Sequence, residues 1–218
     1  RFVAQSVAAF TRYERQGGPV KTEDDPLESN PPAHTERTFA ALNHLERAVT
    51  EFGGIALRYG VFYGAANDGT IEPVRKRQFP IVGEGSGYAS WIHLDDAAAA
   101  TVLALEHDGP AVYNVVDDEP APVREWLPVL ADALGAKPPR HFPVWLARLF
   151  AGDVAVMMGT EVRASSNEKA KTIPCDGLIL DLEDAVAPDA KPAARGAACA
   201  AVASGEYGNR ELTIRING

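Results

Sequence analysis

The sequence predicts an α/β protein assembled from two different pieces. Short apolar runs of strand length alternate with longer segments whose apolar residues recur at helical spacing, a pattern typical of parallel sheets covered by helices. Near residue 166 a basic, polar segment changes without a flexible linker into an apolar run that ends in carboxylates. We therefore predict one domain over residues 1–170 and a second segment over residues 171–218.

The composition limits the classes of protein that the chain can represent. With 218 residues, of which 46% are hydrophobic and 23% charged, it is typical of a globular protein with one large or two small domains. The formal charge of −9 argues against a nucleic-acid groove, and no apolar run approaches the roughly 20 residues of a membrane-spanning helix. We expect neither nucleic acid nor a membrane as a partner, and a cytoplasmic location.

Three local features carry further expectations. Cys175 and Cys199 fit neither a disulfide framework nor a metal site, and their apolar and small neighbours predict buried, reduced thiols. The short basic cluster over residues 75–77 is predicted to be a solvated loop. The sequence begins at Arg1 within a run of strand character, so we expect that its amino end is truncated.

The amino-terminal part is predicted to run through strand, loop, helix and strand. An apolar strand over residues 2–4 precedes a polar loop over 16–32 that is dense in turn residues. A helix follows, and Gly53-Gly54 ends it. The side chains at helical spacing in it are Phe39, Leu42, Leu45 and Val49. The apolar run over 55–59 is then a strand.

The middle part continues this alternation. Residues 79–82 are predicted to form a short strand, and GEGSG over 83–87 a turn on the surface. Asp95 and Asp96 mark the start of a helix, because acidic side chains there accept hydrogen bonds from free backbone N–H groups and face the positive end of the helix dipole. The remaining elements are a strand over 112–116, a helix over 123–134 that Gly135 ends, and a helix over 142–158 that breaks near Gly152.

Five motifs follow one another in the first domain. They are RFVAQS (1–6), VKTEDDPLESNPP (20–32), LRYGVFYG (57–64), IVGEGSGYASWIHLDD (81–96) and VYNVVDDEP (112–120). In this order they resemble the later part of an extended short-chain dehydrogenase/reductase, of the NAD(P)-dependent epimerase/dehydratase family. The resemblance implies a Rossmann-like fold, NAD or NADP as cofactor, and a nucleotide sugar or similar small-molecule substrate. It also implies that Ser6 is the family's catalytic Ser or Thr.

The sequence departs from this family at two places. The Gly-rich turn that holds the dinucleotide phosphates is not found in the chain. In the family a Tyr and a Lys four residues later exchange the proton, and a Glu usually follows the Lys by four. Counting back from Glu46 places Leu42 at the Lys position and Thr38 at the Tyr position. Neither side chain can exchange the proton. Tyr13 and Tyr59 are alternative phenols without a Lys in register, so we expect impaired redox activity.

Four side chains of the first domain are candidates for its site. Ser6 is a candidate catalytic donor to a substrate hydroxyl, and a strand-end serine bonded to the backbone is the alternative. His93 is a candidate acid or base beside Asp95 and Asp96, and a structural histidine at a helix start is the alternative. Arg58 and Tyr63 are predicted to line the substrate side of the cleft. Trp91 and Trp126 are predicted to belong to the core or to a lid.

Two strings near the carboxyl end carry a second resemblance. LILDLEDAVAPDAK (178–191) and TIRING (213–218) are similar to the beginning of the citrate lyase β-subunit-like branch of the HpcH/HpaI aldolases, over residues of about 166–218. This resemblance implies a (β/α)8 barrel that cleaves or forms carbon–carbon bonds of acyl-CoA or 2-oxo-acid substrates, usually with Mg²⁺. The matching substrate-binding positions are Asp181, Glu183, Asp184 and Arg215.

The residues themselves agree with a first β-α-β unit of such a barrel. The apolar run over 178–180 predicts a buried parallel strand, followed by a helix over 192–204 and a strand over 212–215. Acidic groups after the first strand would lie at the catalytic edge of a barrel, and the forked donors of Arg215 suit a carboxylate. Helix capping and a solvated loop are the alternatives for the acidic residues. The acidic residues would hold Mg²⁺ only loosely.

The sequence leaves three functions open. The first is an impaired epimerase/dehydratase relative, the second a carbon–carbon lyase, and the third a non-catalytic binding module whose exposed sheet edges pair with another copy. SNEKAK, residues 166–171, fits both family resemblances, so the junction shows no linker. The chain is a natural fusion, an excerpt or a mis-assembled reading frame, and the sequence does not decide among these.

Overall fold

The computed structural model describes residues 2–10, 12–64, 69–171, 177–181, 192, 195–196, 199, 202–203 and 211–215. The chain forms two compact units, Arg1–Thr172 and Ile173–Gly218. Both contain parallel strand pairs, and the first combines them with helices, so the predicted α/β class is confirmed. In the described part of the chain no helix is both long and apolar enough to cross a membrane.

A parallel three-stranded sheet forms the centre of the first unit. Its order is β1 (Val3–Val7), β3 (Ile55–Tyr59) and β8 (Ala111–Val115). All five residues of β3 are buried, as its unbroken apolar run predicts for a central parallel strand. Val7 pairs with Tyr59 and Tyr59 with Val115, so the three strands end at one edge of the sheet.

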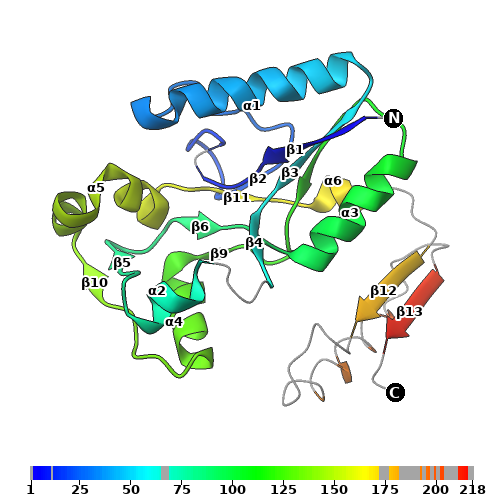
Figure 1. Ribbon diagram of the computed structural model, residues 1–218. Coiled ribbons are helices and arrows are strands. Elements are labelled where there is room, and N and C mark those ends of the chain that lie inside the picture. The colour runs from blue at the N-terminus through cyan, green and yellow to red at the C-terminus, as the bar shows by residue number, and fades with distance from the viewer. Residues whose placement is uncertain are drawn as a thin grey trace. The chain divides into compact units, whose positions relative to one another are not determined.

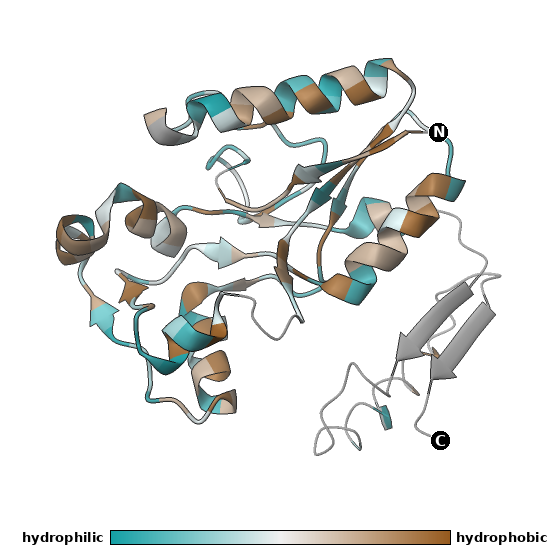
Figure 2. Ribbon diagram, in the orientation of Figure 1, coloured by the Kyte–Doolittle hydropathy of each residue, from teal (hydrophilic) through white to brown (hydrophobic). Residues whose placement is uncertain are grey.

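Two helices accompany this sheet, α1 (Ala33–Glu51) and α3 (Leu94–Glu106), and in Figure 1 the three strands run between them. Helix α1 is banded in hydrophilic and hydrophobic residues (Figure 2), as its helical spacing predicts. It ends before Gly53, which takes the left-handed conformation that favours glycine. At Gly54 a Cβ would lie 2.7 Å from the carbonyl oxygen of Phe2, so only glycine allows this close approach.

Short strand pairs and further helices complete the first unit, and most of them lie to one side of the central sheet (Figure 1). The parallel pairs are β4 (Val61–Tyr63) with β7 (Trp91–His93), β5 (Ile81–Val82) with β10 (His141–Phe142), and β2 (Val20–Lys21) with β11 (Ala164–Ser165). The antiparallel pair is β6 (Tyr88–Ala89) with β9 (Ala121–Pro122). The helices are α2 (Ile71–Arg75), α4 (Val123–Ala133), α5 (Val144–Thr160) and α6 (Glu168–Lys171).

The two residues of β5 belong to two separate apolar clusters. Ile81 packs with Leu127 of α4 and Val74 of α2, whereas Val82 packs with Ala147 and Val156 of α5. Successive side chains of a strand point to opposite faces, so this short strand connects both clusters. The predicted break of α5 is confirmed, because Gly152 has φ 76° and ψ −177° inside it.

Two local predictions for this unit are only partly correct. Within the GEGSG turn Glu84 is exposed, whereas Gly85 and Gly87 are buried. A Cβ at Gly87 would lie 2.3 Å from the carbonyl oxygen of Met158, so the missing side chains let α5 approach the turn. The basic cluster is exposed at Arg75 and Lys76, but Arg75 ends α2 and both pair with Glu72, so it is not simply a loop.

The second unit contains two paired strands. β12 (Gly177–Asp181) and β13 (Glu211–Arg215) are parallel, with Leu178 opposite Leu212 and Asp181 opposite Arg215. Helical backbone occurs at the described positions between residues 192 and 203, within the predicted helix. Cys199 is a free, exposed cysteine, which corrects the prediction of a buried thiol. Its alanine-rich surroundings offer little apolar surface to cover it. Cys175 lies outside the described residues.

Candidate functional site

The carboxyl ends of β1, β3 and β8 form the edge where open parallel sheets bind their ligands. Beyond this edge β4 carries Tyr63, its parallel partner β7 carries His93, and Asp117 follows β8 after one residue. Strand pairing sets Tyr63 directly in register with His93. The backbone N–H of Asp117 donates to the carbonyl oxygen of Trp91 at 2.7 Å, which fixes the loop after β8 against β7.

Tyr63, His93 and Asp117 form one cluster at this edge. The rings of Tyr63 and His93 meet edge to face, with centroids 5.1 Å apart. The Tyr63 hydroxyl donates to the carboxylate of Asp117, which also accepts from the backbone N–H of His93. Tyr63 and His93 were predicted from the sequence, and the structure brings them together. Asp117 was missed, although its place just after a strand of the central sheet is a signal that could have found it.

Burial controls the protonation of this cluster. Burial, with the nearby charges of Asp117 and Asp96, raises the pKa of Tyr63 to about 12, so this phenol keeps its proton at neutral pH. Burial also raises the pKa of Asp117 above its ordinary value, although hydrogen bonds from Tyr63 and His93 oppose it. Tyr63 is therefore a neutral hydrogen-bond donor at neutral pH and not a phenolate base.

His93 caps the helix that follows it. Its Nδ1 accepts a hydrogen bond from the backbone N–H of Asp95 at 3.2 Å, so the neutral ring carries its proton on Nε2. A Cβ at Gly64 would lie 2.3 Å from Nε2, so the glycine makes room for this ring. The structural alternative for His93 is thus realised, and its catalytic role stays a prediction.

Replacement of His93 tests the capping contact directly. His93→Ala removes the acceptor at the start of α3 and is expected to cost about 1 kcal/mol of unfolding free energy. His93→Asn retains a side-chain acceptor and should recover most of that loss. Urea denaturation followed by circular dichroism measures both variants, and equal stability of His93→Ala and the parent chain would contradict the contact.

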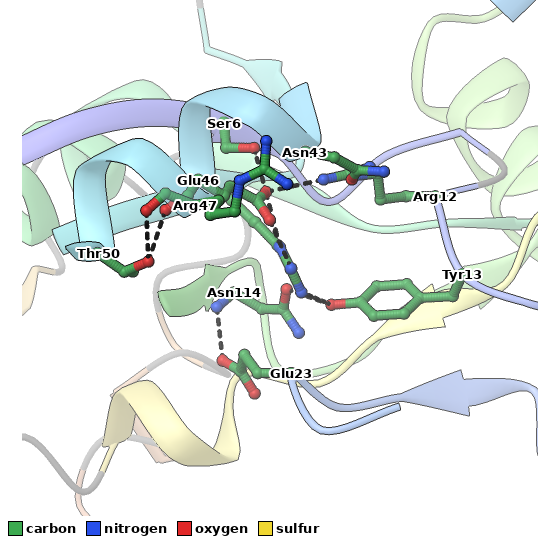
Figure 3. Close-up of polar contacts among 10 residues, drawn as sticks. Ser6, Arg12, Tyr13, Glu23, Asn43, Glu46, Arg47, Thr50 and Asn114 are labelled. Carbon is green, nitrogen blue, oxygen red and sulfur yellow. Dashed lines mark hydrogen bonds and ion pairs between the residues drawn. The ribbon is translucent and has the colours of Figure 1, made fainter. Parts of the chain in front are cut away.

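Ser6 and Arg58 belong to a buried network around Glu46 (Figure 3). The Ser6 hydroxyl donates to Oε1 of Glu46 at 2.5 Å, and Arg58 donates to both carboxylate oxygens at 2.9 and 2.7 Å. Arg12 adds an ion pair to Oε1 at 3.0 Å. Ser6 is 0% exposed and Arg58 4%, so the groups predicted to meet substrate are engaged internally. Their substrate roles stay predictions.

The two arginines change the charge balance of this network. Burial alone would raise the pKa of Glu46, but hydrogen bonds from Arg58 and Ser6 and the charge of Arg12 outweigh it, so the pKa is lowered. Burial alone would likewise lower the pKa of Arg58, but Glu46 and Tyr13 reverse the direction and raise it. The carboxylate is therefore held ionised between two guanidinium groups.

The same network ties the polar loop to the central sheet. Nη1 of Arg58 donates to the Tyr13 hydroxyl at 3.0 Å, and that hydroxyl donates to Oδ1 of Asn114 at 2.7 Å. The backbone N–H of Asn114 donates to Glu23 at 2.6 Å. Burial raises the pKa of Tyr13, so this phenol is a structural donor. The sequence did not predict that the segment before this loop carries a buried arginine, Arg12.

On α1 the two positions matched to the family's Tyr and Lys differ in exposure. Thr38 is exposed and Leu42 half-buried, while Glu46, one further turn along, is buried. Tyr59, the other alternative phenol, shares a 2.5 Å hydrogen bond with the hydroxyl of Thr101, and burial raises its pKa. Where a pKa shift is resolved among the described tyrosines of this unit, the phenol is therefore a weaker acid than a free tyrosine.

A cavity of about 350 Å³ lies beside the Tyr63 cluster. Aromatic side chains form much of its wall, and these are Phe10, Phe79, Tyr88, Trp91 and Trp126. The ring of Trp91 meets that of Tyr63 with centroids 6.4 Å apart and that of Trp126 with centroids 5.2 Å apart. Both tryptophans are half-buried at the cavity wall, so they are not simply core, and the prediction did not foresee this cavity.

The candidate positions of the second unit are only partly described. Asp181 and Arg215 stand in register at the carboxyl ends of the two parallel strands, the edge at which a barrel of this type places its site. Glu183 and Asp184 lie outside the described residues. Among the side chains that the structure describes, no three of His, Cys, Asp and Glu gather as a metal site would require, so no step is assigned to Mg²⁺.

Comparison with known proteins separates the two parts of the chain. Residues 157–218 match the family model of HpcH/HpaI aldolase/citrate lyase. A 62-residue stretch is 42% identical to L-malyl-CoA/β-methylmalyl-CoA lyase of Rhodobacter capsulatus, covering 28% of this chain and 20% of that protein. The predicted second resemblance is confirmed, and the matched region begins before the predicted residue 166.

The larger part of the chain is similar to reductases and epimerases. Over 181 residues it is 39% identical to a 3-diazoavenalumate denitrifying reductase from a Streptomyces species, covering 79% of this chain and 59% of that protein. A human epimerase family protein solved with NADPH superposes with a TM-score of 0.59 at 22% identity, covering 77% of this chain and 57% of that one. The Rossmann-like fold of the first unit is thereby confirmed, and the chain spans less than two thirds of each of these proteins.

Proposed function

We propose that the first unit is the substrate side of an NAD(P)-dependent epimerase/dehydratase-like oxidoreductase that acts on a nucleotide sugar or a similar small molecule. The Tyr63–Asp117 pair at the carboxyl edge of the sheet, beside a cavity, is the observation that carries the proposal. The similarity to a reductase supports it, and the fold shared with an NADPH complex is consistent with it. NAD or NADP is assigned by resemblance, and the described residues form no Gly-rich phosphate turn, so no step runs through the cofactor.

The side chains of this unit support proton delivery at a substrate oxygen. Tyr63 donates its proton to that oxygen as negative charge develops on it, and water returns a proton to the phenolate beside Asp117. The pKa of Tyr63, about 12, makes its proton hard to release. Turnover is therefore slow, in agreement with the departures of the sequence from the family's Tyr–Lys pair.

Removal of one hydroxyl tests this assignment. Tyr63→Phe is expected to lower kcat about tenfold, because general acid catalysis by a weakly acidic phenol contributes little more. Tyr113→Phe is the matched control, since its hydroxyl bonds His107 away from the cluster. The assay first titrates the 218-residue chain with NAD⁺, NADP⁺ and NADPH by calorimetry. It then separates the products of UDP-glucose by chromatography, because an epimerase or dehydratase returns the hydride and leaves no net change in nicotinamide absorbance. Unchanged turnover in Tyr63→Phe contradicts the role, and no binding of any nicotinamide favours the non-catalytic module.

A second function has its own support in the carboxyl-terminal part. We propose that residues 171–218 are the first β-α-β unit of a (β/α)8 barrel of a Mg²⁺-dependent carbon–carbon lyase acting on acyl-CoA. The match to the family model and the parallel pairing of β12 with β13 support it. In this proposal Arg215 binds a substrate carboxylate through its forked donors, and Asp181, Glu183 and Asp184 shape the same edge.

Cleavage of malyl-CoA in the presence and absence of Mg²⁺ tests the lyase. Mg²⁺-dependent release of acetyl-CoA is expected to fall at least tenfold in Arg215→Lys, because a lysine cannot replace a bidentate contact. Arg195→Lys, at an exposed described position, is the control. Cleavage that survives a chelator, or that Arg215→Lys leaves unchanged, would rule the assignment out. Homo-oligomers formed through exposed sheet edges remain a prediction, which the mass of the chain in solution would test.

A further inference from the structure

The cavity beside Tyr63 differs in chemistry from a site for a charged nucleotide sugar. Among the described residues that line it, none carries a charge, and the polar side-chain groups are the hydroxyls of Thr70 and Tyr88 and the indole N–H groups of Trp91 and Trp126. A diphosphate moved from water into such walls would lose its hydration without gaining a cationic partner, which is strongly unfavourable. The walls therefore favour an uncharged ligand over the predicted nucleotide sugar.

The indole N–H of Trp126 marks where such a ligand would be held. This nitrogen is buried and has no hydrogen-bond partner in the described part of the chain, although Trp126 lies at the cavity wall. A buried donor without an acceptor is destabilising, so native proteins rarely leave one unused. An oxygen acceptor on a bound molecule would satisfy it once the indole turns to bring its N–H to the cavity surface.

The arrangement of the tryptophans favours a flat ligand. Trp91 and Trp126 meet at an interplanar angle of 78°, so their ring faces are nearly perpendicular to each other. A planar ring can stack on one of these faces and present its edge to the other, which is the geometry that aromatic pairs prefer. At about 350 Å³ the cavity is at the small end of the range of roughly 300–1,000 Å³ for small-molecule sites.

The position of the cavity connects it with the proposed chemistry. Trp91 makes edge-to-face contacts with the rings of both Tyr63 and Trp126, and it lines the cavity whereas Tyr63 does not. We infer that the cavity binds an uncharged, flat aromatic molecule through one oxygen acceptor that faces Trp126. This inference goes beyond the proposed function, because it names a ligand for a neighbouring cavity that Tyr63 does not line.

Two bicyclic probes of one shape separate the contributions to binding. 1-Indanone carries a carbonyl acceptor and indane has none. Calorimetry measures the affinity of each probe for the full 218-residue chain without nicotinamide. Trp126→Phe retains an aromatic wall and removes the N–H together with part of the indole, a loss of contact area that affects both probes alike. It is expected to weaken 1-indanone about five- to tenfold, the effect of one hydrogen bond, and to change indane less than twofold. An equal effect on both probes overturns the role of the N–H.

A second pair of variants tests the cavity itself. Ala155→Phe fills the space and is expected to abolish binding of both probes, whereas Ala151→Phe, at an exposed position on the same helix, leaves binding unchanged. Circular dichroism confirms that each variant is folded. Binding of 1-indanone that persists in folded Ala155→Phe, or the absence of saturable binding in the parent chain, overturns the inference.

UDP-glucose provides the comparison between substrate classes. It is expected to bind at least tenfold more weakly than 1-indanone and not to displace it. Tighter binding of UDP-glucose, with displacement of 1-indanone, would restore the nucleotide sugar and overturn the inference. Failure of the proposed function is distinguishable from failure of this inference. If no nicotinamide binds, or if Tyr63→Phe does not change turnover, the binding of 1-indanone is still expected to be unchanged.

Discussion

Glu46→Ala is expected to lower the free energy of unfolding by about 3–5 kcal/mol, the loss seen when one partner of a buried ion pair is removed. Glu46 accepts hydrogen bonds from Ser6 and Arg58 and forms an ion pair with Arg12. Both arginines are almost fully buried, Arg12 being 1% and Arg58 4% exposed. Without Glu46 two positive charges remain together in the interior with no compensating carboxylate. Their mutual repulsion, in a place where water does not screen it, lowers the free energy of unfolding.

Chemical denaturation followed by circular dichroism measures this change. Glu51→Ala is the control, because it removes a carboxylate from the same helix at an exposed position and is expected to change stability by less than about 0.5 kcal/mol. A similar small effect for Glu46→Ala would mean that the arginines are hydrated in solution, against their burial in the structure.

The pH dependence of stability provides an independent measure of the same carboxylate. The folded-state pKa of Glu46 is lowered from its ordinary value of 4.5, so its contribution is fully present above that value. The contribution is lost as the pH falls through the lowered folded-state pKa. Glu46→Gln resembles the protonated acid, so the stability gap between it and the parent should be constant above about pH 5.5 and should narrow below about pH 4.5. If the difference in stability between the parent chain and Glu46→Gln does not change with pH, Glu46 is not ionised in the folded protein.

Gly87→Ala is the second large change, with an expected loss of about 2–3 kcal/mol of unfolding free energy. An added Cβ would lie 2.3 Å from the carbonyl oxygen of Met158, 2.8 Å from the carbonyl carbon of Gly159 and 2.9 Å from the backbone nitrogen of Thr160. All three are backbone atoms of α5, so no side-chain rotation relieves the overlap and the helix must shift. Met158 and Gly159 also line the cavity, so 1-indanone should bind more weakly to this variant.

Gly18→Ala is the matched control for this substitution. Its added Cβ would meet nothing closer than 3.9 Å, and a methyl group there restricts the unfolded chain, so stability should stay within about 0.5 kcal/mol or rise slightly. Thermal unfolding compares the two variants with the parent chain. If Gly87→Ala unfolds at the same temperature as Gly18→Ala, the GEGSG turn is not packed against α5 in solution.

Individual residues show how far the sequence predicted the candidate site. Tyr63 and His93 were assigned from motifs, and strand pairing brings them into register. Asp117 was missed because its role depends on the hydrogen bond from Tyr63, and nothing in the local sequence reports that contact. Ser6 was assigned to substrate from its motif alone, whereas the carboxylate that engages it comes from a helix 40 positions further along the chain.

The sequence by itself determined the α/β class, most of the helices and central strands, the break at Gly152 and the double resemblance, because these depend on local periodicity, turn residues and contiguous motifs. Only the tertiary structure decided that Gly85 and Gly87 are buried, that Arg12 and Arg58 share one carboxylate, and that Trp91 and Trp126 line a cavity without charged residues among its described walls. These features join residues far apart in the chain. Burial and partner charge, which set their pKa values and energies, exist only once the elements have packed.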